Sequence, residues 1–545
     1  MNNIQNLHLF SFTKYINPLN IYKNSPPLYL ILPTIILVLI LALPIIYLSI
    51  RTTEATDTAW GILFSIRSLE TLGRSLLLML TVTSLSAFIA IPLAWITSRT
   101  DLPLSKMWTV LATLPLVIPS FIGAYLFNSA FGPKGLLQNL LEQPLGIEKL
   151  PDVSGLFGAT IVLTLLSYPY FFLTIRGAIN NIDPSTEESS RALGYNPFTT
   201  FIKITLPQLK PAIIAGVLLV SLYTLSDFGA VSLMRYNTFT WTIYQQYGSV
   251  IDRTASATLS LALVSTAIII LILEQYTRGK QKYHRIASGS SRKPQIIQLG
   301  LWKYPCILIV GLLIGLALII PISILIFWLI RGISNGEPMI FSLSITIATL
   351  TVSIVTSIIT VLFAITMSLI IVRYPNRINR LFESLSYTGY ALPGVVVAIS
   401  LVYFGANYAL PLYQTHFLLV LSYIILFFPV ALGATNASLL TIDPKLEQSA
   451  RILNHSYPNV IRKITIPLMK PGLMMAASLV FLLTAKELPA TLILGPIGFK
   501  TLATQVWAAS SEAFFAQAAA PALTIILISI LPLSIFISRD TRINS

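Results

Sequence analysis

The chain is poor in the residues on which water-soluble proteins depend. Only 10% of its 545 residues are Asp, Glu, Lys or Arg, whereas a soluble globular domain carries roughly 25%. Hydrophobic residues make up 55% of the chain. So few charges cannot cover a surface of this size in water, which excludes an ordinary soluble domain. The composition predicts an integral membrane protein.

Cysteine and histidine are also scarce. The single cysteine, Cys306, excludes an intramolecular disulfide and a multi-cysteine metal site. The histidines, His8, His284, His416 and His455, are scattered along the chain, and none lies in mid-span beside another. This distribution argues against a haem or quinone site. We therefore expect no catalytic residue, no metal site and no cofactor bound by this chain.

The sequence lacks a G-x-x-x-x-G-K-[ST] phosphate-binding loop. The segment that comes nearest, 495–501, has Phe499 between its second glycine and its lysine, and it follows a predicted span. We interpret it as an external loop, so the chain is not expected to hydrolyse ATP. A membrane enzyme, such as a lipid or polymer synthase, would need a cluster of catalytic carboxylates or histidines at one face, and the sequence has none.

Long apolar runs take the place of the missing charges. A membrane span needs about 20 mostly apolar residues, and the first run, 28–50, is too long for the apolar region of a cleavable signal. We therefore expect an all-α integral membrane protein with about twelve transmembrane helices. They are predicted near 28–50, 71–97, 107–131, 156–178, 211–234, 256–275, 305–330, 343–372, 383–405, 415–438, 471–494 and 517–538.

The distribution of basic residues predicts the orientation. If the N-terminus is cytoplasmic, all but ten of the 35 Lys and Arg residues fall on cytoplasmic segments. The net charge of +15 then reflects topology, and no nucleic-acid partner is expected. Both termini are predicted to be cytoplasmic, in a multi-pass protein of the bacterial inner membrane. The predicted organisation is a tail at 1–27, a six-span half at 28–275, a basic linker at 276–304, a second half at 305–538 and a tail at 539–545.

The two halves repeat one another. At an offset of 260, Asp183-Pro184 matches Asp443-Pro444, Lys203-Ile-Thr matches Lys463-Ile-Thr, and Asp227 matches Glu487. Further upstream, Pro115 and Pro393 are expected to correspond at an offset of 278, which would make the first half about 18 residues longer near 132–155. Six spans per half give a parallel duplication with a pseudo-twofold axis along the membrane normal.

The strongest repeat lies in two predicted cytoplasmic loops, 183–210 and 443–470. In the first loop, Asp183 is a good N-cap and Pro184 a good first helical residue. Gly194 can adopt the left-handed conformation that ends a helix. These features predict a short helix, a turn and a second short helix along the cytoplasmic face. Such an elbow can dock on a soluble partner and pass force to the spans on either side.

Both loops resemble the E-A-A loop of binding-protein-dependent ABC importer permeases. Glu188-Ser-Ser-Arg-Ala-Leu-Gly194, then nine residues, then Ile204-Thr-Leu-Pro207, has the spacing of that loop. The resemblance implies the type I (MetI-like) permease fold, a partner ABC ATPase subunit in two copies that uses the ATP, and a periplasmic or lipid-anchored binding protein. The implied coupling residues are Glu187, Glu188, Arg191, Gly194, Ile204, Pro207, Glu447, Gln448, Arg451, Asn454, Ile464 and Pro467.

The second loop departs from the family pattern at two positions. Gln448 stands where the family has Glu, and Asn454 stands where it has Gly. After glycine, asparagine is among the residues that best tolerate the left-handed conformation of a helix cap. We therefore expect the second elbow to keep its fold. Because Gln448 lacks the charge of the family's Glu, we expect the first loop to couple more strongly to the ATPase subunit than the second loop does.

Three charges lie within predicted spans, where charges are costly and usually face a cavity or one another. They are Asp227, Lys486 and Glu487. One interpretation places them at a translocation path or gate, and the other makes them a structural ion pair, such as Lys486 with Asp227. The sequence does not decide between these interpretations.

The segment Lys486-Glu-Leu-Pro-Ala-Thr491 resembles the iron(III) branch of the permease family, whose members carry two halves on one chain. The resemblance implies a ferric iron importer, with thiamine, polyamine or phosphonate as alternative substrates. An ion-gradient-driven secondary transporter would also have twelve spans, but it would not have paired elbows with this spacing.

Overall fold

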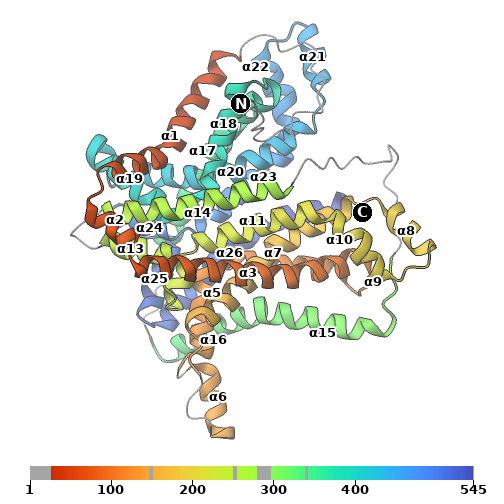
Figure 1. Cartoon of the computed structure of the whole chain (residues 1–545), viewed down its shortest axis with the longest axis vertical. Coiled ribbons are helices and arrows are strands. Elements are labelled where there is room, and N and C mark those ends of the chain that lie inside the picture. The colour runs from red at the N-terminus through yellow and green to blue at the C-terminus, as the bar shows by residue number, and fades with distance from the viewer. Residues whose placement is uncertain are drawn as a thin grey trace, which may run out of the picture. The chain divides into compact units, whose positions relative to one another are not determined.

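The computed structural model describes residues 26–133, 135–146, 151–248, 254–278, 296–337 and 342–543. Within these ranges every regular element is a helix, apart from one isolated bridge between Thr100 and Ile297 (Figure 1). Most of the predicted N-terminal tail and of the basic linker lies outside the described residues.

The α-helices, in chain order, are α1 (Leu28–Thr53), α2 (Asp57–Leu63), α3 (Ile66–Arg99), α4 (Ser105–Thr113), α5 (Ser120–Phe131), α6 (Leu136–Leu145), α7 (Gly155–Asn181), α8 (Pro184–Ala192), α9 (Pro197–Thr200), α10 (Leu206–Gln208), α11 (Lys210–Ser226), α12 (Gly229–Leu233), α13 (Phe239–Gly248), α14 (Thr254–Arg278), α15 (Lys303–Ile314), α16 (Ile320–Ser334), α17 (Leu343–Arg373), α18 (Arg377–Tyr387), α19 (Gly394–Tyr408), α20 (His416–Leu440), α21 (Pro444–Ile452), α22 (Tyr457–Val460), α23 (Ile466–Ala485), α24 (Pro489–Leu494), α25 (Leu502–Ser511) and α26 (Phe515–Ile543). Short 3-10 turns are η1 (Leu114–Val117), η3 (Gly300–Trp302), η5 (Thr388–Ala391) and η6 (Leu410–Leu412), and π-helical turns are η2 (Phe201–Thr205), η4 (Gly315–Ile319) and η7 (Ile461–Thr465).

The apolar helices reproduce the predicted spans. Among the described residues, eight single helices are long and apolar enough to cross a membrane, and three further pairs do so as bent spans. The shorter apolar helix Phe515–Ile530 stands at the position of the twelfth predicted span. In chain order these segments match the twelve predicted spans one for one, which confirms the predicted all-helical membrane fold.

The third and ninth spans are sharply broken at prolines. Ile118 and Leu392 precede Pro119 and Pro393, and both are extended, with ψ of 117° and 111°. The proline ring disfavours the helical conformation of the residue before it, so each helix stops there and a new one starts after the proline. The pairs are Ser105–Val117 with Ser120–Gln138, bent by 94°, and Arg377–Ala391 with Gly394–Tyr408, bent by 110°.

The breaks correct the predicted alignment of the two halves. Pro119 and Pro393 each form an N-cap with nearly the same backbone angles, and each follows a 3-10 turn. They correspond at an offset of 274, so the predicted pairing of Pro115 with Pro393 at 278 is wrong. Pro115 lies inside the 3-10 turn η1, one turn too early. The first half is therefore longer than the second by about 14 residues rather than 18, given the offset of 260 downstream.

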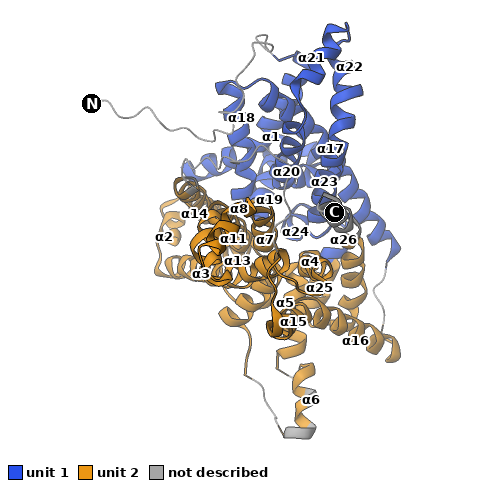
Figure 2. Cartoon of the chain, turned by 90° about the vertical axis from the view of Figure 1, so that its right-hand side faces the viewer, with its two compact units in different colours: residues 1–54, 342–504, 531–542 blue, residues 55–341, 505–530, 543–545 orange. Residues whose placement is uncertain are grey.

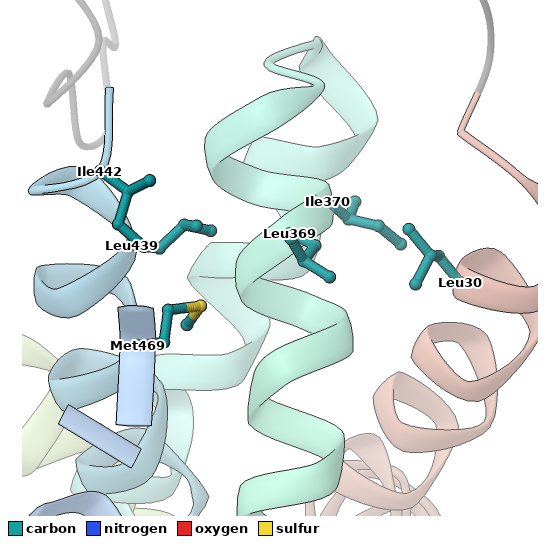
Figure 3. Packing of buried hydrophobic residues seen from close by; sticks show 6 residues of the cluster. All are labelled: Leu30, Leu369, Ile370, Leu439, Ile442 and Met469. Atoms are coloured by element: carbon teal, nitrogen blue, oxygen red, sulfur yellow. The ribbon is translucent and has the colours of Figure 1, made fainter. Parts of the chain in front are cut away.

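The chain forms two compact units (Figure 2). Unit 1 comprises residues 1–54, 342–504 and 531–542. Its centre is formed by α17, α20 and α23, which pack on one another, and α1 packs against α17 and α19. A buried apolar cluster packs at one end of α1 (Figure 3). Its members are Leu30, Leu369, Ile370, Leu439, Ile442 and Met469.

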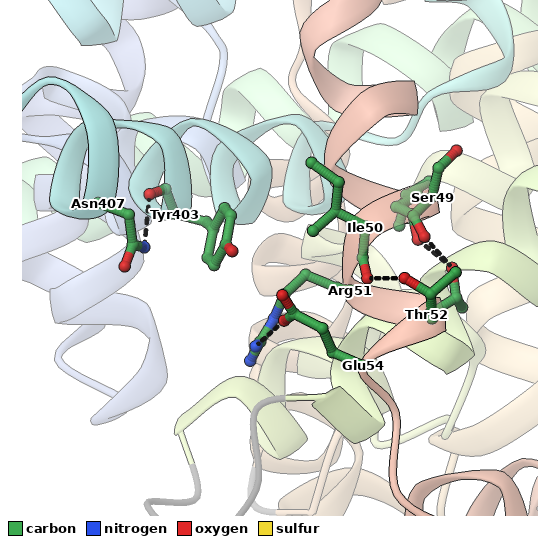
Figure 4. A network of polar contacts seen from close by, with 9 residues as sticks. Ser49, Ile50, Arg51, Thr52, Glu54, Tyr403 and Asn407 are labelled. Atoms are coloured by element: carbon green, nitrogen blue, oxygen red, sulfur yellow. Dashed lines mark hydrogen bonds and ion pairs between the residues drawn. The ribbon is translucent and has the colours of Figure 1, made fainter.

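The other end of α1 is held by a polar and aromatic network (Figure 4). The Arg51 guanidinium lies 5.2 Å from the ring centroid of Tyr403 on α19, and it pairs with Glu54 at 2.9 Å. The Tyr47 ring packs on the same tyrosine, with centroids 5.2 Å apart. Arginine is well suited to this place because its flat cation can stack on an aromatic face while it hydrogen-bonds a carboxylate.

Unit 2 comprises residues 55–341, 505–530 and 543–545. It is centred on α3, α7 and α11, and α15 and α16 pack against α4 and α5. The Trp328 indole N–H, on α16, donates to the Ser129 hydroxyl on α5 at 2.6 Å. Each unit thus combines the central spans of one sequence half with the first span of the other. The halves predicted at 28–275 and 305–538 describe the duplication in the sequence, and the compact units cut across them.

Within unit 2, the end of the predicted linker is attached to the end of α3. Thr100 and Asp101 run beside Ile297, whose N–H donates to the Arg99 carbonyl at 2.9 Å. The Asp101 carboxylate accepts the Leu299 N–H at 2.8 Å and pairs with Lys303 at 2.7 Å. Lys303 and the Leu299 N–H hold the pKa of Asp101 below its usual range. A lowered pKa means that the attachment is complete at neutral pH and is lost as the pH falls through that lowered value.

The substitution Asp101→Asn tests this attachment. It removes the ion pair with Lys303 and weakens the hydrogen bond from the Leu299 amide, so amide hydrogen exchange at 297–299 should become several-fold faster at pH 7. Mass spectrometry of exchange reads this out, with the amides of α7 as the unaffected internal reference. Unchanged exchange at 297–299 would show that the carboxylate is not what holds this segment.

Candidate functional site

The first predicted elbow is a helix with well-formed ends. The Asp183 side chain caps α8 by accepting the Ser185 N–H at 3.0 Å, and Pro184 is the first helical residue. At the other end Gly194 has φ of 89°. The Gly194 N–H donates to the Arg191 carbonyl and the Tyr195 N–H to the Ser190 carbonyl, at 2.9 and 3.3 Å. This is the Schellman pattern, in which a left-handed residue satisfies the last carbonyls of the helix.

The second elbow has the same geometry despite its altered sequence. Asp443 caps α21 by accepting the Lys445 N–H at 2.9 Å. Asn454 takes the place of the glycine with φ of 64°, and its N–H donates to the Arg451 carbonyl. The His455 N–H donates to the Ala450 carbonyl, as in the first copy. The expectation that the elbow survives with asparagine in the left-handed position agrees with this geometry.

Each elbow continues into the fifth span of its half through a π-helical turn. In the first copy, α9 leads into η2, and the helices on either side of Leu209 are bent by 69°. In the second copy, α22 leads through η7 into α23 without such a bend, so that 457–485 forms one span. Isolated π turns are rare in proteins and are frequent at functional sites. The sequence motif did not predict them.

A buried carboxylate lies behind the first elbow. Glu187, in the first turns of α8, is 4% exposed. Arg99, the last residue of α3, places its Nε 3.3 Å from Oε2 of Glu187 and donates an Nη2–H to the Ile179 carbonyl at 3.0 Å. The Thr205 hydroxyl, from the π turn, donates to Oε1 of Glu187 at 2.9 Å. We call Arg99, Glu187 and Thr205 the first triad.

The second elbow repeats this arrangement. Glu447 is 1% exposed, and Arg373, the last residue of α17, donates Nε–H and Nη2–H to its two oxygens at 3.0 and 3.1 Å. The Thr465 hydroxyl donates to Oε1 of Glu447 at 2.9 Å. Arg373, Glu447 and Thr465 form the second triad. A guanidinium that binds both carboxylate oxygens is among the strongest ion-pair geometries in proteins.

The structure therefore divides the predicted coupling residues into two groups. Glu187 and Glu447 lie in the interior, where they hold the elbow to neighbouring helices. The others lie on or near the elbow surface. These are Glu188, Gln448, Arg191, Ile204 and Ile464, all half-buried; Pro207 and Pro467, exposed at the entry to the next helix; Gly194 and Asn454, exposed at the caps; and Arg451, exposed and stacked 5.7 Å from the Tyr457 ring centroid.

Four members of the triads are missing from the predicted set. The threonines belong to the repeated Lys-Ile-Thr segments, but no role follows from that repeat alone. From the sequence alone, Arg99 and Arg373 serve only as basic residues that indicate the orientation of the chain in the membrane. A usable signal exists, because both arginines end the second span of their half at an offset of 274, the same offset that relates Pro119 to Pro393.

The predicted intramembrane charges lie at breaks in the helices rather than within them. Asp227 follows α11 and accepts the N–H groups of Ala230 and Val231 at 2.9 and 3.3 Å, so it caps the short helix α12. Glu487 follows α23 and accepts the Ala490 N–H at 3.2 Å at the start of α24. Lys486 directly follows the last residue of α23 as its C-cap, and it is half-buried. Both carboxylates thus satisfy backbone groups that a broken helix exposes.

Each of these breaks packs closely on the broken third or ninth span. A Cβ atom placed on Gly229 would lie 2.7 Å from Cβ of Phe121, in α5. A Cβ atom placed on Gly394, at the start of α19, would lie 2.7 Å from Oε1 of Glu487. Glycine at these two positions lets the two broken spans of each unit touch. No group of three or more His, Cys, Asp or Glu side chains that could hold a metal ion occurs among the described residues.

The fold and the two elbows define a class: a multi-pass membrane protein with a duplicated helix–turn–helix elbow. Comparison with known families agrees. Residues 87–278 and 360–539 each match the family described as binding-protein-dependent transport system inner membrane component. Each matched segment contains one elbow. The chain belongs to this family, and it carries the family's domain twice.

Individual relatives match either most of the chain or about half of it. The Fe(3+)-transport system permease protein FbpB 2 of Haemophilus influenzae is 33% identical over 521 residues, which cover 93% of this chain and 98% of that protein. The ferric transport system permease protein FbpB of Actinobacillus pleuropneumoniae is 26% identical over 70% of this chain and 60% of its own length. The molybdenum transport system permease protein ModB of Mycobacterium tuberculosis is 28% identical, with 45% of this chain covering 92% of that protein. A single-domain relative thus corresponds to about half of this chain.

The two helix caps can be compared by substitution. A Cβ atom at Gly194 would meet no described atom within 4 Å, so Gly194→Ala should cost only the backbone strain of the left-handed conformation, about 1–2 kcal/mol. Asn454→Gly should be neutral or slightly stabilising. Amide exchange at Tyr195 and His455 measures the local opening. Gly433→Ala, at an open helical position in α20, is the matched control and should not weaken either cap. Equal behaviour of Gly194→Ala and Gly433→Ala would contradict the assignment of the cap.

Proposed function

We propose that this chain is the permease subunit of an ABC importer that carries ferric iron, delivered by a binding protein, across the bacterial inner membrane. The single observation that best supports an ABC importer permease is the pair of elbows. Both have the same caps, the same left-handed turn and the same buried triad, and the chain contains the family's domain twice. The substrate is proposed from the 33% identity, over nearly the whole length, to a relative named for Fe(3+) transport.

Each elbow presents apolar side chains suited to a soluble partner. Leu193 and Phe198 of the first elbow are 80% and 67% exposed, and Ile452 and Leu453 of the second are 84% and 74% exposed. Clusters of large exposed apolar side chains mark interaction surfaces. The partner is an ABC ATPase subunit, with one copy on each elbow. That subunit binds and hydrolyses ATP, so this chain needs no cofactor and catalyses no reaction of its own.

The two elbows differ in charge. Glu188 of the first copy is replaced by Gln448 in the second, although the backbone of the two elbows is alike. A carboxylate in the middle of α8 can accept charge-assisted hydrogen bonds from a partner, and these are stronger than the neutral hydrogen bonds that an amide oxygen accepts. The first elbow therefore makes the larger contribution to coupling.

Orientation in the membrane follows the basic residues. The elbows and both termini face the cytoplasm, where most Lys and Arg residues lie. A periplasmic or lipid-anchored binding protein delivers the substrate on the opposite face. We place a gate for the substrate at the helix break of each unit, after Ser226 in unit 2 and after Ala485 in unit 1. Asp227, Lys486 and Glu487 lie at these breaks. Helix breaks within a membrane are tolerated where they line a cavity or are covered by protein, which suits a gate.

Reconstitution tests the proposal. The chain is placed in proteoliposomes with its ATPase subunit and its binding protein loaded with radiolabelled ferric iron. Iron should enter only when ATP is supplied to the ATPase side. If thiamine, a polyamine or a phosphonate enters instead, the substrate is wrong but the class holds. Uptake driven by a proton or sodium gradient without ATP would contradict the class.

A docking variant gives the same experiment a structural readout. Leu193→Asp combined with Ile452→Asp places charges on both elbow surfaces and should abolish co-purification of the ATPase subunit. The matched control is Leu104→Asp, at a 66% exposed leucine in the loop after α3. Retention of the ATPase by the double variant would show that the elbows are not the docking surface.

A further inference from the structure

The two triads have a property that simple stabilisation does not explain. Their three residue types are the same in both halves of the chain, while several other positions that the repeat relates have diverged. Glu188 has become Gln448, Gly194 has become Asn454, and Asp227 has become Glu487. A buried ion pair is also a poor way to gain stability, because apolar side chains of similar volume often serve as well or better. Retention in both copies therefore indicates a function of the pair itself.

Geometry suggests what that function is. One carboxylate joins three elements that are separate in the sequence. Glu187 lies on the elbow helix α8, Arg99 ends α3, and Thr205 lies in the π turn that leads toward α11. Arg99 also binds the Ile179 carbonyl near the end of α7. A displacement of α8 by a bound partner therefore either moves α3 and the π turn with it or breaks the buried ion pair and the hydrogen bond from Thr205.

We propose that Arg99 and Arg373 are positioning residues for coupling: through Glu187 and Glu447 they lock each elbow to the ends of α3 and α17, so that a push on the elbow moves the spans. This inference rests on the proposed function. The lock is stiff because breaking a buried ion pair by removing one partner leaves an uncompensated charge in the interior. The threonine hydroxyl adds the third connection, from the carboxylate to the π turn.

The test separates coupling from folding. In the variant Arg99→Met, Glu187→Leu, Thr205→Val, apolar side chains replace the whole first triad, so no buried charge is left unpaired and the elbow can still pack. Arg373→Met, Glu447→Leu, Thr465→Val does the same for the second triad. Both sets are combined, and the complex with the ATPase subunit and binding protein is assayed in proteoliposomes for ATP hydrolysed and ferric iron transported.

The expected result is loss of coupling with the assembly retained. The combined variant should reach the membrane and bind the ATPase subunit, and it should hydrolyse ATP without stimulation by the iron-loaded binding protein. Iron transported per ATP should fall by about tenfold or more, within the usual range of coupling between sites. The mild variant Thr205→Val with Thr465→Val removes one connection of each lock and should lower the same ratio by a smaller factor.

Three outcomes decide the matter. Normal iron transport per ATP in the combined variant would overturn the proposal, because the ion pairs would then be dispensable for coupling. Loss of all variants from the membrane, including the threonine pair, would also overturn it and assign the triads to folding. The matched control is Arg74→Gln, which removes an exposed pair with Glu70 at 3.8 Å and should leave the ratio unchanged. If the unaltered chain shows no ATP-dependent iron uptake, the proposed substrate or class fails instead, independently of the triads.

Discussion

A carboxylate without access to water must be paired, and this constraint organises the elbow end of each unit. Glu187 and Glu447 are almost fully buried, so each requires a cation and further donors at hydrogen-bonding distance. Arg99 and Arg373 meet that need from the ends of two long helices. The requirement fixes where α3 and α17 end relative to the elbows, and it explains why a short surface helix has a defined position on the spans behind it.

The same chemistry recurs deeper in each unit. A helix broken within a bilayer exposes backbone N–H groups that no water can satisfy. Asp227 and Glu487 accept such N–H groups at the starts of α12 and α24. Glycines at 229 and 394 then allow the broken spans to approach closely. The intramembrane carboxylates thus have a structural task in each unit, and this task is compatible with the gate proposed at the same breaks.

Local features of this fold were predictable, and long-range ones were not. The spans follow from apolar length, and the elbows follow from Asp-Pro starts and from Gly194 or Asn454 at the caps, because all of these depend on neighbours in the sequence. The pairing of Arg99 with Glu187 joins residues 88 positions apart. The exchange of α1 between sequence halves depends on packing against α17 and α19. Neither has a local signal, since apolar spans look alike in composition.

Two prolines near the break in the third span give competing local signals. Pro115 precedes the break in the third span and Pro119 lies in it, and spacing alone matches either proline to Pro393. The backbone decides for Pro119, because its predecessor Ile118 is extended while Pro115 continues a 3-10 turn. The consequence is small for the fold, but it sets the offset at which Arg99 and Arg373 become equivalent.

The central claim is that elbow and helix end move as one body, and a distance measurement tests it most directly. Spin labels are placed at Ser185, exposed on α8, and at Leu104, exposed in the loop after α3, in a chain whose one native cysteine, Cys306, is replaced by alanine. Pulsed electron resonance then compares the assembled transporter without nucleotide and with ATP bound. The account predicts the same label separation in both states. A change of several ångströms on ATP binding would mean that the elbow pivots independently of α3, and it would contradict the account.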